Sequence, residues 1–543
     1  MKKTTYILII TVFIAAFLRF WQLGQIPPSL SWDEVAWGYN AYSLGISGKD
    51  EFGKFLPHEY LESYGDFKPP VYAYLDILPV KIFGLTEFAV RFPSAFFGTF
   101  TILLTFFLVR EIFGTKKDKG DILGLIAAGI LAVSPWHIML SRAAFEANVS
   151  TFFIGMGVLF FVVAVKRNMW FLSISILSFM VSIYTFNSPR IVAPLLVLML
   201  SIGFYKVLWK NKKQTILAVI IGIILLLPIL PFLLSPQASL RFKEVNIFTN
   251  LETINLINQE IENDRNSIIS KLIHNRRIVF GVEFLKHYLD NLDPNFLFIK
   301  GDGNPRFSTQ DVGQLYIVEL PFLLIGVIFL FKKRTGYWWI IPLWFLIGIL
   351  PAASARETPH ALRIESSLPT FQILVAYGIF GVGLWLWGKQ KKAFTVFVVG
   401  YSLLLLFNIY YFLHGYFNHY PREYASEWQY GYKDAVFYTK EHESEYDQIY
   451  MTSMLGRPYI YFLFYNAVSP QTFRQTSDIT RDAFGFVTVN GFSKYRFLQT
   501  IPKKVKQENA LYIDIPMNIP PGAKVQKTFY LPGGDVALVA YTI

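Results

Sequence analysis

Eleven apolar segments, each close to the length of a membrane-spanning helix, constrain the fold of this chain more than any other feature. A helix needs about 20 mostly apolar residues to cross the hydrocarbon core of a bilayer. Only 16% of the 543 residues are charged, against about 25% in soluble domains. The sequence therefore predicts an all-α polytopic membrane protein with about eleven transmembrane helices. They lie near residues 4–23, 88–109, 121–140, 148–165, 169–186, 190–208, 214–235, 315–331, 337–353, 368–387 and 393–413.

Lysine and arginine predict how these helices cross the membrane, because basic residues gather in the short cytoplasmic connections of membrane proteins. We expect the N-terminus inside and, after an odd number of spans, the C-terminus outside, in a multi-pass protein of the cell (plasma or inner) membrane. The long outer segments are then 24–87, 236–314 and 414–543. One alternating set of segment ends carries the basic residues Lys2, Lys3, Arg110, Lys116, Lys117, Lys119, Lys166, Arg167, Lys206, Lys210, Lys212, Lys213, Lys332, Lys333, Arg334, Lys389, Lys391 and Lys392.

The last outer segment is long enough to form a small domain. We predict a membrane domain of residues 1–413, which includes the outer segments 24–87 and 236–314, and an extracytoplasmic C-terminal domain of residues 414–543. We expect the latter to be α/β and to influence acceptor binding rather than chemistry. Its expected elements are strands at Tyr446–Thr452, Ala510–Ile515 and Ala537–Ile543, a strand or buried helix at Tyr459–Tyr465, and a turn at Pro520, Pro521 and Gly522.

Composition excludes several classes of function. The chain has no cysteine, which excludes disulfides, thiol catalysis and cysteine-ligated zinc. The net charge of +12 indicates, in a membrane protein, topology signals and contact with anionic lipid, so nucleic acid is not an expected partner.

Two adjacent carboxylates, Asp33 and Glu34, follow the first apolar segment by about ten residues and lie between Trp32 and Trp37. Tryptophan favours the membrane–water interface, and a carboxylate beside lipid is costly unless it is paired or functional. One interpretation makes Asp33 the N-cap of a helix. The other makes it a general base held at the membrane surface. The spacing alone leaves both open.

A lysine on a stiff loop follows in the same outer segment. Lys68 precedes Pro69 and Pro70, and these prolines keep its backbone away from helix. A lysine fixed at the level of the lipid headgroups suits a phosphate ligand. The alternative is a lysine that reaches ordinary lipid phosphates.

Three further outer turns carry charged residues. Arg142 and Glu146 lie between the third and fourth segments, Arg190 begins the sixth, and His360 and Arg363 lie between the ninth and tenth. Binding of a phosphate or pyrophosphate would explain arginines at these places. An ion pair between Arg142 and Glu146, four residues apart on one helix face, is the structural alternative.

Four motifs thus follow one another along the predicted outer face. They are Asp33-Glu34, Asp66-x-Lys68-Pro69-Pro70, Phe83-Gly84-x-x-Glu87-x-Ala89-x-Arg91-x-Pro93-Ser94 and the turn Pro359–Arg363. As an ordered set they resemble the GT-C superfamily, and within it bacterial glycosyltransferase family 39. That family is related to dolichyl-phosphate-mannose protein mannosyltransferases and to the lipid A aminoarabinose transferase. The resemblance is strong over residues 1–200 and fades in 236–314 and in the C-terminal domain.

The resemblance implies a GT-C fold and an inverting glycosyltransferase. Its donor would be a sugar on a polyprenyl phosphate, and its acceptor a hydroxyl on a protein, lipid or glycan at the outer face. By position, the family's base maps to Asp33 and its phosphate-contacting lysine to Lys68. Glu146 matches an acid that is often Asp in relatives. The candidate catalytic residues are therefore Asp33, Glu34 and Glu146, and the candidate ligands of the donor phosphate are Lys68, Arg142, Arg190, His360 and Arg363.

This set of residues is sufficient for the implied chemistry. An inverting displacement needs one base and cations for the leaving phosphate, whereas a glycosidase needs two carboxylates that flank the bond. No metal is assigned, although Asp33, Glu34, Glu146 and His360 are compatible ligands of a divalent cation. Three alternatives remain. They are a polytopic transporter or flippase for lipid-linked sugars, a scaffold for surface polymers, and an oligosaccharyltransferase. A transport path needs charges near the bilayer midplane, and here they collect on one face.

Overall fold

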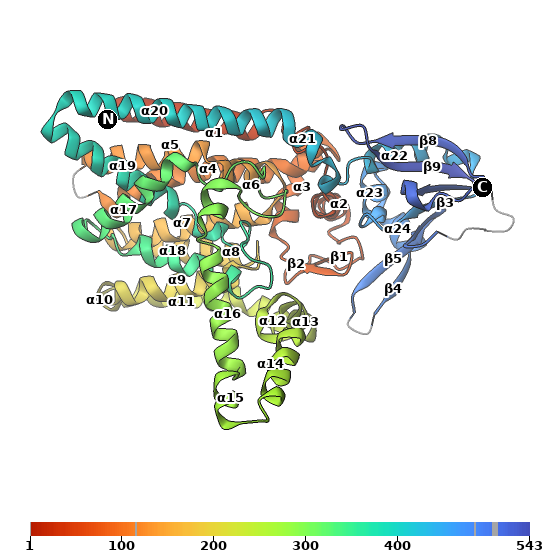
Figure 1. The fold of residues 1–543 in the computed structure, drawn as a ribbon, viewed down its shortest axis with the longest axis horizontal. Coiled ribbons are helices and arrows are strands. Elements are labelled where there is room, and N and C mark those ends of the chain that lie inside the picture. Colours follow the sequence, from red (N-terminus) through yellow and green to blue (C-terminus); the bar gives the residue numbers. More distant parts are fainter. Residues whose placement is uncertain (1, 115–116, 483–484, 502–508) are drawn as a thin grey trace. The chain divides into compact units, whose positions relative to one another are not determined.

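The computed structural model places helices in every one of the eleven apolar segments (Figure 1). The structure describes residues 2–114, 117–482, 485–501 and 509–543, so Lys116, one of the basic residues used to predict the orientation, lies outside the described residues. The helices are α1 (Lys2–Phe20), α4 (Glu87–Phe113), α5 (Lys117–Val133), α6 (Pro135–Arg142), α7 (Glu146–Lys166), α8 (Phe171–Ile183), α9 (Pro189–Gly203), α10 (Tyr205–Lys210), α11 (Lys212–Leu226), α12 (Leu230–Leu233), α17 (Leu320–Lys333), α18 (Ile340–Ala353), α19 (Thr370–Lys389) and α20 (Lys391–His414).

Six helices among the described residues are long and apolar enough to cross a membrane. A seventh span results if α5 and α6, which are bent by 57° relative to each other, count as one, and α8, α9 and α18 are shorter apolar helices. The chain is thus a mostly helical membrane protein with six or seven candidate spans, and the larger number of eleven stays a prediction. The difference arises from helix length, because α8, α9, α17 and α18 have only 13, 15, 14 and 14 residues, against the about 20 that a span needs.

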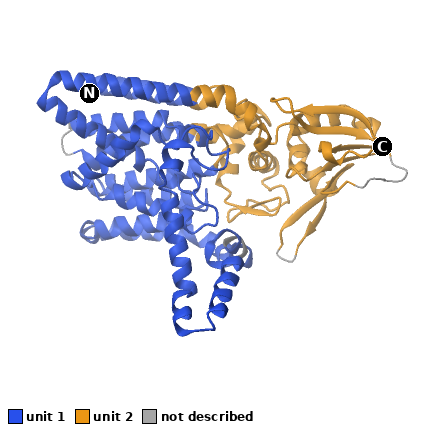
Figure 2. Ribbon diagram, in the orientation of Figure 1, with its two compact units in different colours: residues 1–18, 97–140, 146–412 blue, residues 19–96, 141–145, 413–543 orange. Residues whose placement is uncertain are grey.

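The described chain divides into two compact units (Figure 2). Unit 1 comprises residues 1–18, 97–140 and 146–412, and unit 2 comprises residues 19–96, 141–145 and 413–543. Compactness therefore groups most of the first outer segment with the C-terminal residues, whereas the sequence led us to place the domain boundary at residue 413.

Unit 1 contains most of the apolar helices. α17 and α19 approach so closely that the backbone of Gly326 lies against the carbonyl of Leu374, and that of Gly378 against the carbonyl of Phe322. Small residues permit such close packing between membrane helices. A second apolar cluster joins Ala15 of α1 to α4 and α5.

Residues 236–314 of unit 1, predicted as an outer segment, are largely helical. α14 and α16 are amphipathic, and each begins with an asparagine whose side chain caps the helix. The helices are α13 (Pro236–Val245), α14 (Leu251–Asn263), α15 (Ile268–Ile273) and α16 (Arg276–Asp290).

Unit 2 joins two short helices and a hairpin of the first outer segment to the C-terminal residues. The first set is α2 (Trp32–Ser47), β1 (Leu61–Ser63), β2 (Asp66–Lys68) and α3 (Val71–Phe83). The second is α21 (Tyr420–Glu423), α22 (Tyr432–Glu441), β3 (Gln448–Thr452), α23 (Pro458–Tyr465), α24 (Pro470–Thr476), β4 (Asp478–Arg481), β5 (Val487–Phe492), β6 (Tyr495–Leu498), β7 (Ala510–Asp514), β8 (Lys524–Tyr530) and β9 (Val536–Thr542).

The C-terminal strands form one mixed sheet in the order β4-β5-β6-β3-β7-β9-β8. β3 is parallel to both β6 and β7, and the remaining pairs are antiparallel. The predicted strands at 446–452, 510–515 and 537–543 correspond to β3, β7 and β9, and the segment 459–465 is the buried helix α23. The predicted mixture of helices and strands in this part of the chain is confirmed.

Candidate active site

The N-terminus of α2 sets the directions of both acidic residues of the first motif. Ser31 is the N-cap, and the backbone N–H of Ser31 donates to Glu34 Oε2 at 2.9 Å, which completes a capping box. The cap is therefore Ser31 with Glu34, and the interpretation of Asp33 as the N-cap is wrong. Adjacent side chains of a helix point in different directions, so Asp33 and Glu34 have separate surroundings.

Glu34 lies at the centre of a fully buried ionic cluster in unit 2. Arg91 Nε donates to Glu34 Oε1 at 2.9 Å, and the backbone N–H of Ala144 donates to the same oxygen at 3.0 Å. The Arg91 guanidinium also donates to the carbonyl oxygens of Leu23 and Pro27. Both charged side chains have no solvent exposure. This geometry favours a structural role for Glu34, and its predicted catalytic role stays untested.

Asp33 has a different environment. Its Oδ1 accepts hydrogen bonds from the Tyr64 hydroxyl and from Lys68 Nζ, yet its side chain is 40% exposed. Lys68 is only 6% exposed, and its ammonium lies 4.6 Å from the ring centre of Tyr64 and 4.9 Å from that of Trp37. Burial, together with the negative charge of Asp33, holds the pKa of Tyr64 well above its usual value, so this hydroxyl remains a donor.

The β1–β2 hairpin brings Tyr64 and Lys68 to Asp33. Ser63 pairs with Asp66, which leaves Tyr64 and Gly65 as a two-residue turn with φ angles of 39° and 80°. Such a turn needs positive φ at both positions. Lys68 ends β2, and the two prolines that follow lead directly into α3. The stiffness predicted for this loop is thus present, and Tyr64 was not foreseen because its role depends on the turn.

C-terminal residues of unit 2 hold the β1–β2 hairpin and α2 in place. The Tyr459 hydroxyl of α23 accepts the backbone N–H of Tyr64 at 3.0 Å and donates to Glu51 Oε1 at 3.2 Å. Burial raises the pKa of Glu51 to about 8. Tyr39 of α2 donates to the carbonyl oxygen of Val468. α2 and the hairpin are therefore held in place by residues about 400 positions later in the chain.

A cavity of about 360 Å³ adjoins Tyr64 in unit 2. Trp32 and Tyr64 contribute to it from the first outer segment, and Arg457 and Tyr459 from the C-terminal residues. It therefore lies beside the tyrosine that donates to Asp33.

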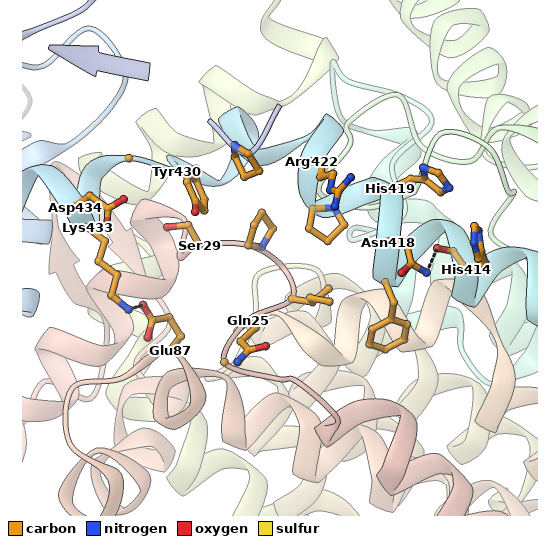
Figure 3. Close-up of a pocket in the computed structure, with 17 residues that line it drawn as sticks. Gln25, Ser29, Glu87, His414, Asn418, His419, Arg422, Tyr430, Lys433 and Asp434 are labelled. Atoms are coloured by element: carbon orange, nitrogen blue, oxygen red, sulfur yellow. Dashed lines mark hydrogen bonds and ion pairs between the residues drawn. The ribbon is translucent and has the colours of Figure 1, made fainter. Parts of the chain in front are cut away.

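A larger cavity of about 830 Å³ lies where the long helix ending in α21 meets the start of α22 (Figure 3). It carries both signs of charge, because Arg422 and Lys433 line it together with Glu87 and Asp434. Lys433 Nζ lies 2.7 Å from Glu87 Oε1, so these two charges compensate each other. We assign no chemistry to this cavity.

Arg142, a predicted phosphate ligand, is fully buried in unit 2. Its guanidinium donates to the carbonyl oxygen of Ile26 at 3.0 Å and lies 4.9 Å from the ring centre of Phe417. α6 ends at Arg142, and α7 begins at Glu146. The two residues are thus not four apart on one helix, and that premise of the alternative ion pair is wrong.

The other predicted site residues belong to unit 1. Glu146 is the first residue of α7. Burial of Glu365, and to a smaller extent the negative charge of Glu146, holds the pKa of Glu365 well above its usual range. Both carboxyl oxygens of Glu365 are buried without a hydrogen-bond partner among the described residues. Two guanidinium nitrogens of Arg190, Nε and Nη2, are likewise buried without a hydrogen-bond partner among the described residues. Glu365 was not foreseen, since nothing in its sequence neighbourhood marks it.

His360 and Arg363 lie in a loop of unit 1. Burial, with a smaller contribution from Arg363, lowers the pKa of His360 to about 3. A neutral imidazole can donate a hydrogen bond to phosphate but adds no charge. Arg363 Nη2 lies 3.5 Å from Glu357 Oε2, which already compensates its charge. Among the described residues, no group of three or more His, Asp or Glu side chains is placed to hold a metal ion.

Comparison with known proteins finds a family match over part of the chain and a shared fold. Residues 67–232 match the family of dolichyl-phosphate-mannose-protein mannosyltransferases. An uncharacterized protein of Aquifex aeolicus is 32% identical over 156 residues, which make up 28% of this chain and 28% of that protein. The predicted resemblance is confirmed.

Two solved structures share the fold. The apo oligosaccharyltransferase of Archaeoglobus fulgidus superposes with a TM-score of 0.53 at 14% identity, over 86% of this chain and 64% of that one. Apo ArnT of Cupriavidus metallidurans superposes with a TM-score of 0.51 at 12% identity, over 99% of this chain and 97% of that one. ArnT bound to undecaprenyl phosphate gives the same values. The GT-C-like fold is thus confirmed, although this chain spans only 28% of the Aquifex protein and 64% of the archaeal protein.

Proposed function

We propose that this chain, whose residues 67–232 match the dolichyl-phosphate-mannose-protein mannosyltransferase family, is an inverting membrane glycosyltransferase. It would move a sugar from a polyprenyl-phosphate donor to an acceptor hydroxyl. The observation that carries the proposal is the Asp33 carboxylate, which remains 40% exposed while Lys68 and Tyr64 hold one of its oxygens. An oriented, accessible carboxylate is what general base catalysis requires.

In the proposed step, the acceptor oxygen forms a bond to the anomeric carbon as its proton passes to Asp33. The bond between the anomeric carbon and the phosphate oxygen breaks on the opposite side, and its electron pair leaves with the polyprenyl phosphate. No general acid is needed, because the leaving group is a weakly basic phosphate. The configuration at the anomeric carbon inverts.

Cations must stabilise the charge that develops on the leaving phosphate. Lys68 donates to Asp33, so an ammonium already stands beside the reacting groups. Arg190 supports an anion site in unit 1, because two of its guanidinium nitrogens are buried without a hydrogen-bond partner among the described residues. Arg142 is fully buried in unit 2 and donates to the carbonyl oxygen of Ile26, and His360 is neutral. Within unit 2 we therefore rank Lys68, which lies beside Asp33, above Arg142 as a phosphate ligand. Within unit 1 we rank Arg190 above His360 and Arg363.

A lipid-linked donor is supported by the solved structure of ArnT with undecaprenyl phosphate, whose fold this chain shares. The basic residues at one set of helix ends support a reaction on the extracytoplasmic face of the cell membrane. The same argument supports eleven spans with the N-terminus inside and the C-terminus outside.

The second candidate is a transporter or flippase for lipid-linked sugars. The buried carboxyl of Glu365, unpartnered among the described residues, favours it, since such groups mark translocation paths in membrane proteins. The exposed Asp33 beside a cavity is not explained by that function.

The two functions make different products. The full-length protein, purified and reconstituted in lipid nanodiscs, is incubated with a panel of undecaprenyl-phosphate-linked sugars and water-soluble methyl glycosides. A transferase releases undecaprenyl phosphate and forms a glycoside of inverted anomeric configuration. In vesicles, movement of the lipid-linked sugar across the bilayer without any new glycosidic bond would establish the transporter instead.

A further inference from the structure

The cavity beside Tyr64 has the lining of a carbohydrate site. Its volume of about 360 Å³ falls in the range of roughly 300–1,000 Å³ found for small-molecule pockets. Trp32, Tyr64, Tyr459 and Phe497 supply aromatic surface, and Ser453 and Thr488 supply hydroxyl groups. Flat apolar surface with a few hydroxyl groups at its edge suits a sugar ring.

One cation gives this cavity a preference among sugars. Arg457 is the single charged residue among the described lining residues, and it forms no ion pair with the described carboxylates. Two other cations of unit 2 differ from it, because Arg481 is paired with Glu62 and Lys433 with Glu87. An uncompensated guanidinium favours a carboxylate or phosphate.

The local backbone holds Arg457 at the rim of the cavity. Gly456 has a φ of 138°, and a Cβ there would lie 2.8 Å from the Trp32 ring, so the loop rests directly on Trp32. Pro458 then begins α23, and Arg457 is its N-cap residue. The N-terminus of a helix also favours negative charge. The Arg457 guanidinium and the N-terminus of α23 therefore both present positive charge to the cavity.

Tyr64 links this cation to the proposed base. The Arg457 guanidinium lies 5.3 Å from the centre of the Tyr64 ring, and the hydroxyl of that ring donates to Asp33. Arg457 and Asp33 therefore contact the same tyrosine side chain, one over its ring and the other at its hydroxyl. A ring with its anionic group on Arg457 would present a hydroxyl to Asp33.

We propose that the cavity beside Tyr64 is the acceptor subsite and that it takes a saccharide bearing a negatively charged group, with Arg457 as the specificity-determining residue. This inference rests on the proposed transferase function, and it names the acceptor class that the family does not specify. It also gives the C-terminal residues a part in acceptor recognition.

The test measures binding to the full-length protein in nanodiscs by saturation-transfer NMR, which needs no turnover. The probes are methyl β-D-glucopyranosiduronate and neutral methyl β-D-glucopyranoside. We expect the uronate to bind about tenfold more tightly, the ratio of one charge-assisted hydrogen bond at a partly exposed site. Arg457→Gln should abolish this preference, and Thr488→Glu, which leaves Arg457 in place, should reverse it. Arg422→Gln, a matched loss of an exposed arginine in the other cavity, should leave it unchanged.

Equal affinity for the two probes, binding of neither, or a preference that survives Arg457→Gln would overturn the inference. The outcome is separable from that of the proposed function. If the uronate binds through Arg457 but no donor is turned over, the transferase proposal fails and the anionic site remains. If turnover occurs but Arg457→Gln leaves the acceptor KM unchanged, the subsite fails and the transferase remains.

Discussion

The two ion pairs made by neighbouring residues of α2 differ in every physical respect except charge. Glu34 and Arg91 have no solvent exposure, and backbone N–H and carbonyl groups saturate their hydrogen bonds. Asp33 is 40% exposed, and its partner Lys68 lies between two aromatic rings. One step along the helix thus separates a buried structural pair from a partly exposed pair bonded to Tyr64, which lines a cavity.

The comparison teaches what distinguishes a reactive carboxylate from a structural one here. A buried carboxylate whose oxygens are all engaged cannot take a proton from a substrate without breaking the cluster around it. An exposed carboxylate held on one oxygen can. We therefore assign stability to the Glu34 pair and, under the proposed function, chemistry to the Asp33 pair.

Removal of one partner of the buried pair should have the largest effect. Arg91→Ala leaves Glu34 buried without its cation, and such a change costs about 3–5 kcal/mol. We expect a large fall in Tm or failure to fold, measured by thermal unfolding of the detergent-purified protein. Arg481→Ala is the matched control, because it breaks an exposed pair with Glu62 and should cost about 1 kcal/mol or less. Equal effects of the two changes would contradict the structural role.

Loss of Lys68, the cation paired with Asp33, should affect turnover more than stability. Lys68→Ala removes a charge-assisted contact worth about 1.5–3 kcal/mol. The direct bond to Asp33 predicts that part of the loss appears in kcat, whereas a pure phosphate ligand would change only the donor KM. Lys54→Ala is the control, since Lys54 lies in the same outer segment and pairs with Glu59. An unchanged kcat and donor KM would remove Lys68 from the site.

Glu51, which accepts a hydrogen bond from Tyr459, should make the stability of the protein depend on pH. The pKa of Glu51 is raised to about 8 by burial, so the folded state keeps a proton that the unfolded state releases. Stability is therefore highest below the unfolded pKa near 4.5 and falls as pH rises toward 8. Glu51→Gln should remove this fall and stabilise the protein at pH 8 by about 1–3 kcal/mol. Thermal unfolding of both proteins at pH 6 and pH 8 tests it, and identical pH dependence would refute the assignment.

The smallest effect is expected from Tyr64→Phe. This change removes the hydroxyl that donates to Asp33 but keeps the ring beneath Arg457. A single hydrogen bond is worth about 0.5–1.5 kcal/mol, so kcat should fall roughly threefold to tenfold. Tyr74→Phe, which loses a bond to the carbonyl oxygen of Pro57, should not change kcat. A Tyr64→Phe protein with unchanged kcat would mean that the hydroxyl does not orient the base.

The same pairs show how far the sequence could be read. Hydropathy predicted the apolar helical segments of unit 1, because each pattern is local, but it did not predict α13 to α16. The capping box Ser31-x-x-Glu34 was also visible as a motif, and it could have assigned the cap to Ser31 and Glu34. Arg91 belongs to the motif that carried the family resemblance, but its pairing with Glu34 spans 57 positions and leaves no local pattern.

Contacts between residues far apart in the sequence could not be predicted, because they also leave no local pattern. Tyr459 meets Tyr64 across 395 positions, and strands β4, β5, β6 and β8 escaped because they are short or carry weak alternation. The sequence led us to expect that a chain ending near residue 413 would still turn over a simple acceptor. The structure changes this expectation, because that truncation would remove α23 and the support of the hairpin.

The most direct test of the central claim is the kcat of Asp33→Asn, measured beside its Tm. The amide keeps the size of the side chain but cannot accept the acceptor's proton, so kcat should fall by about 100- to 10,000-fold. Its Tm should fall less than that of Arg91→Ala, since Asp33 is 40% exposed and does not cap α2, and the amide oxygen can still accept from Lys68. An Asp33→Asn protein with wild-type kcat would contradict the account and move the search for the base to Glu146 and Glu365.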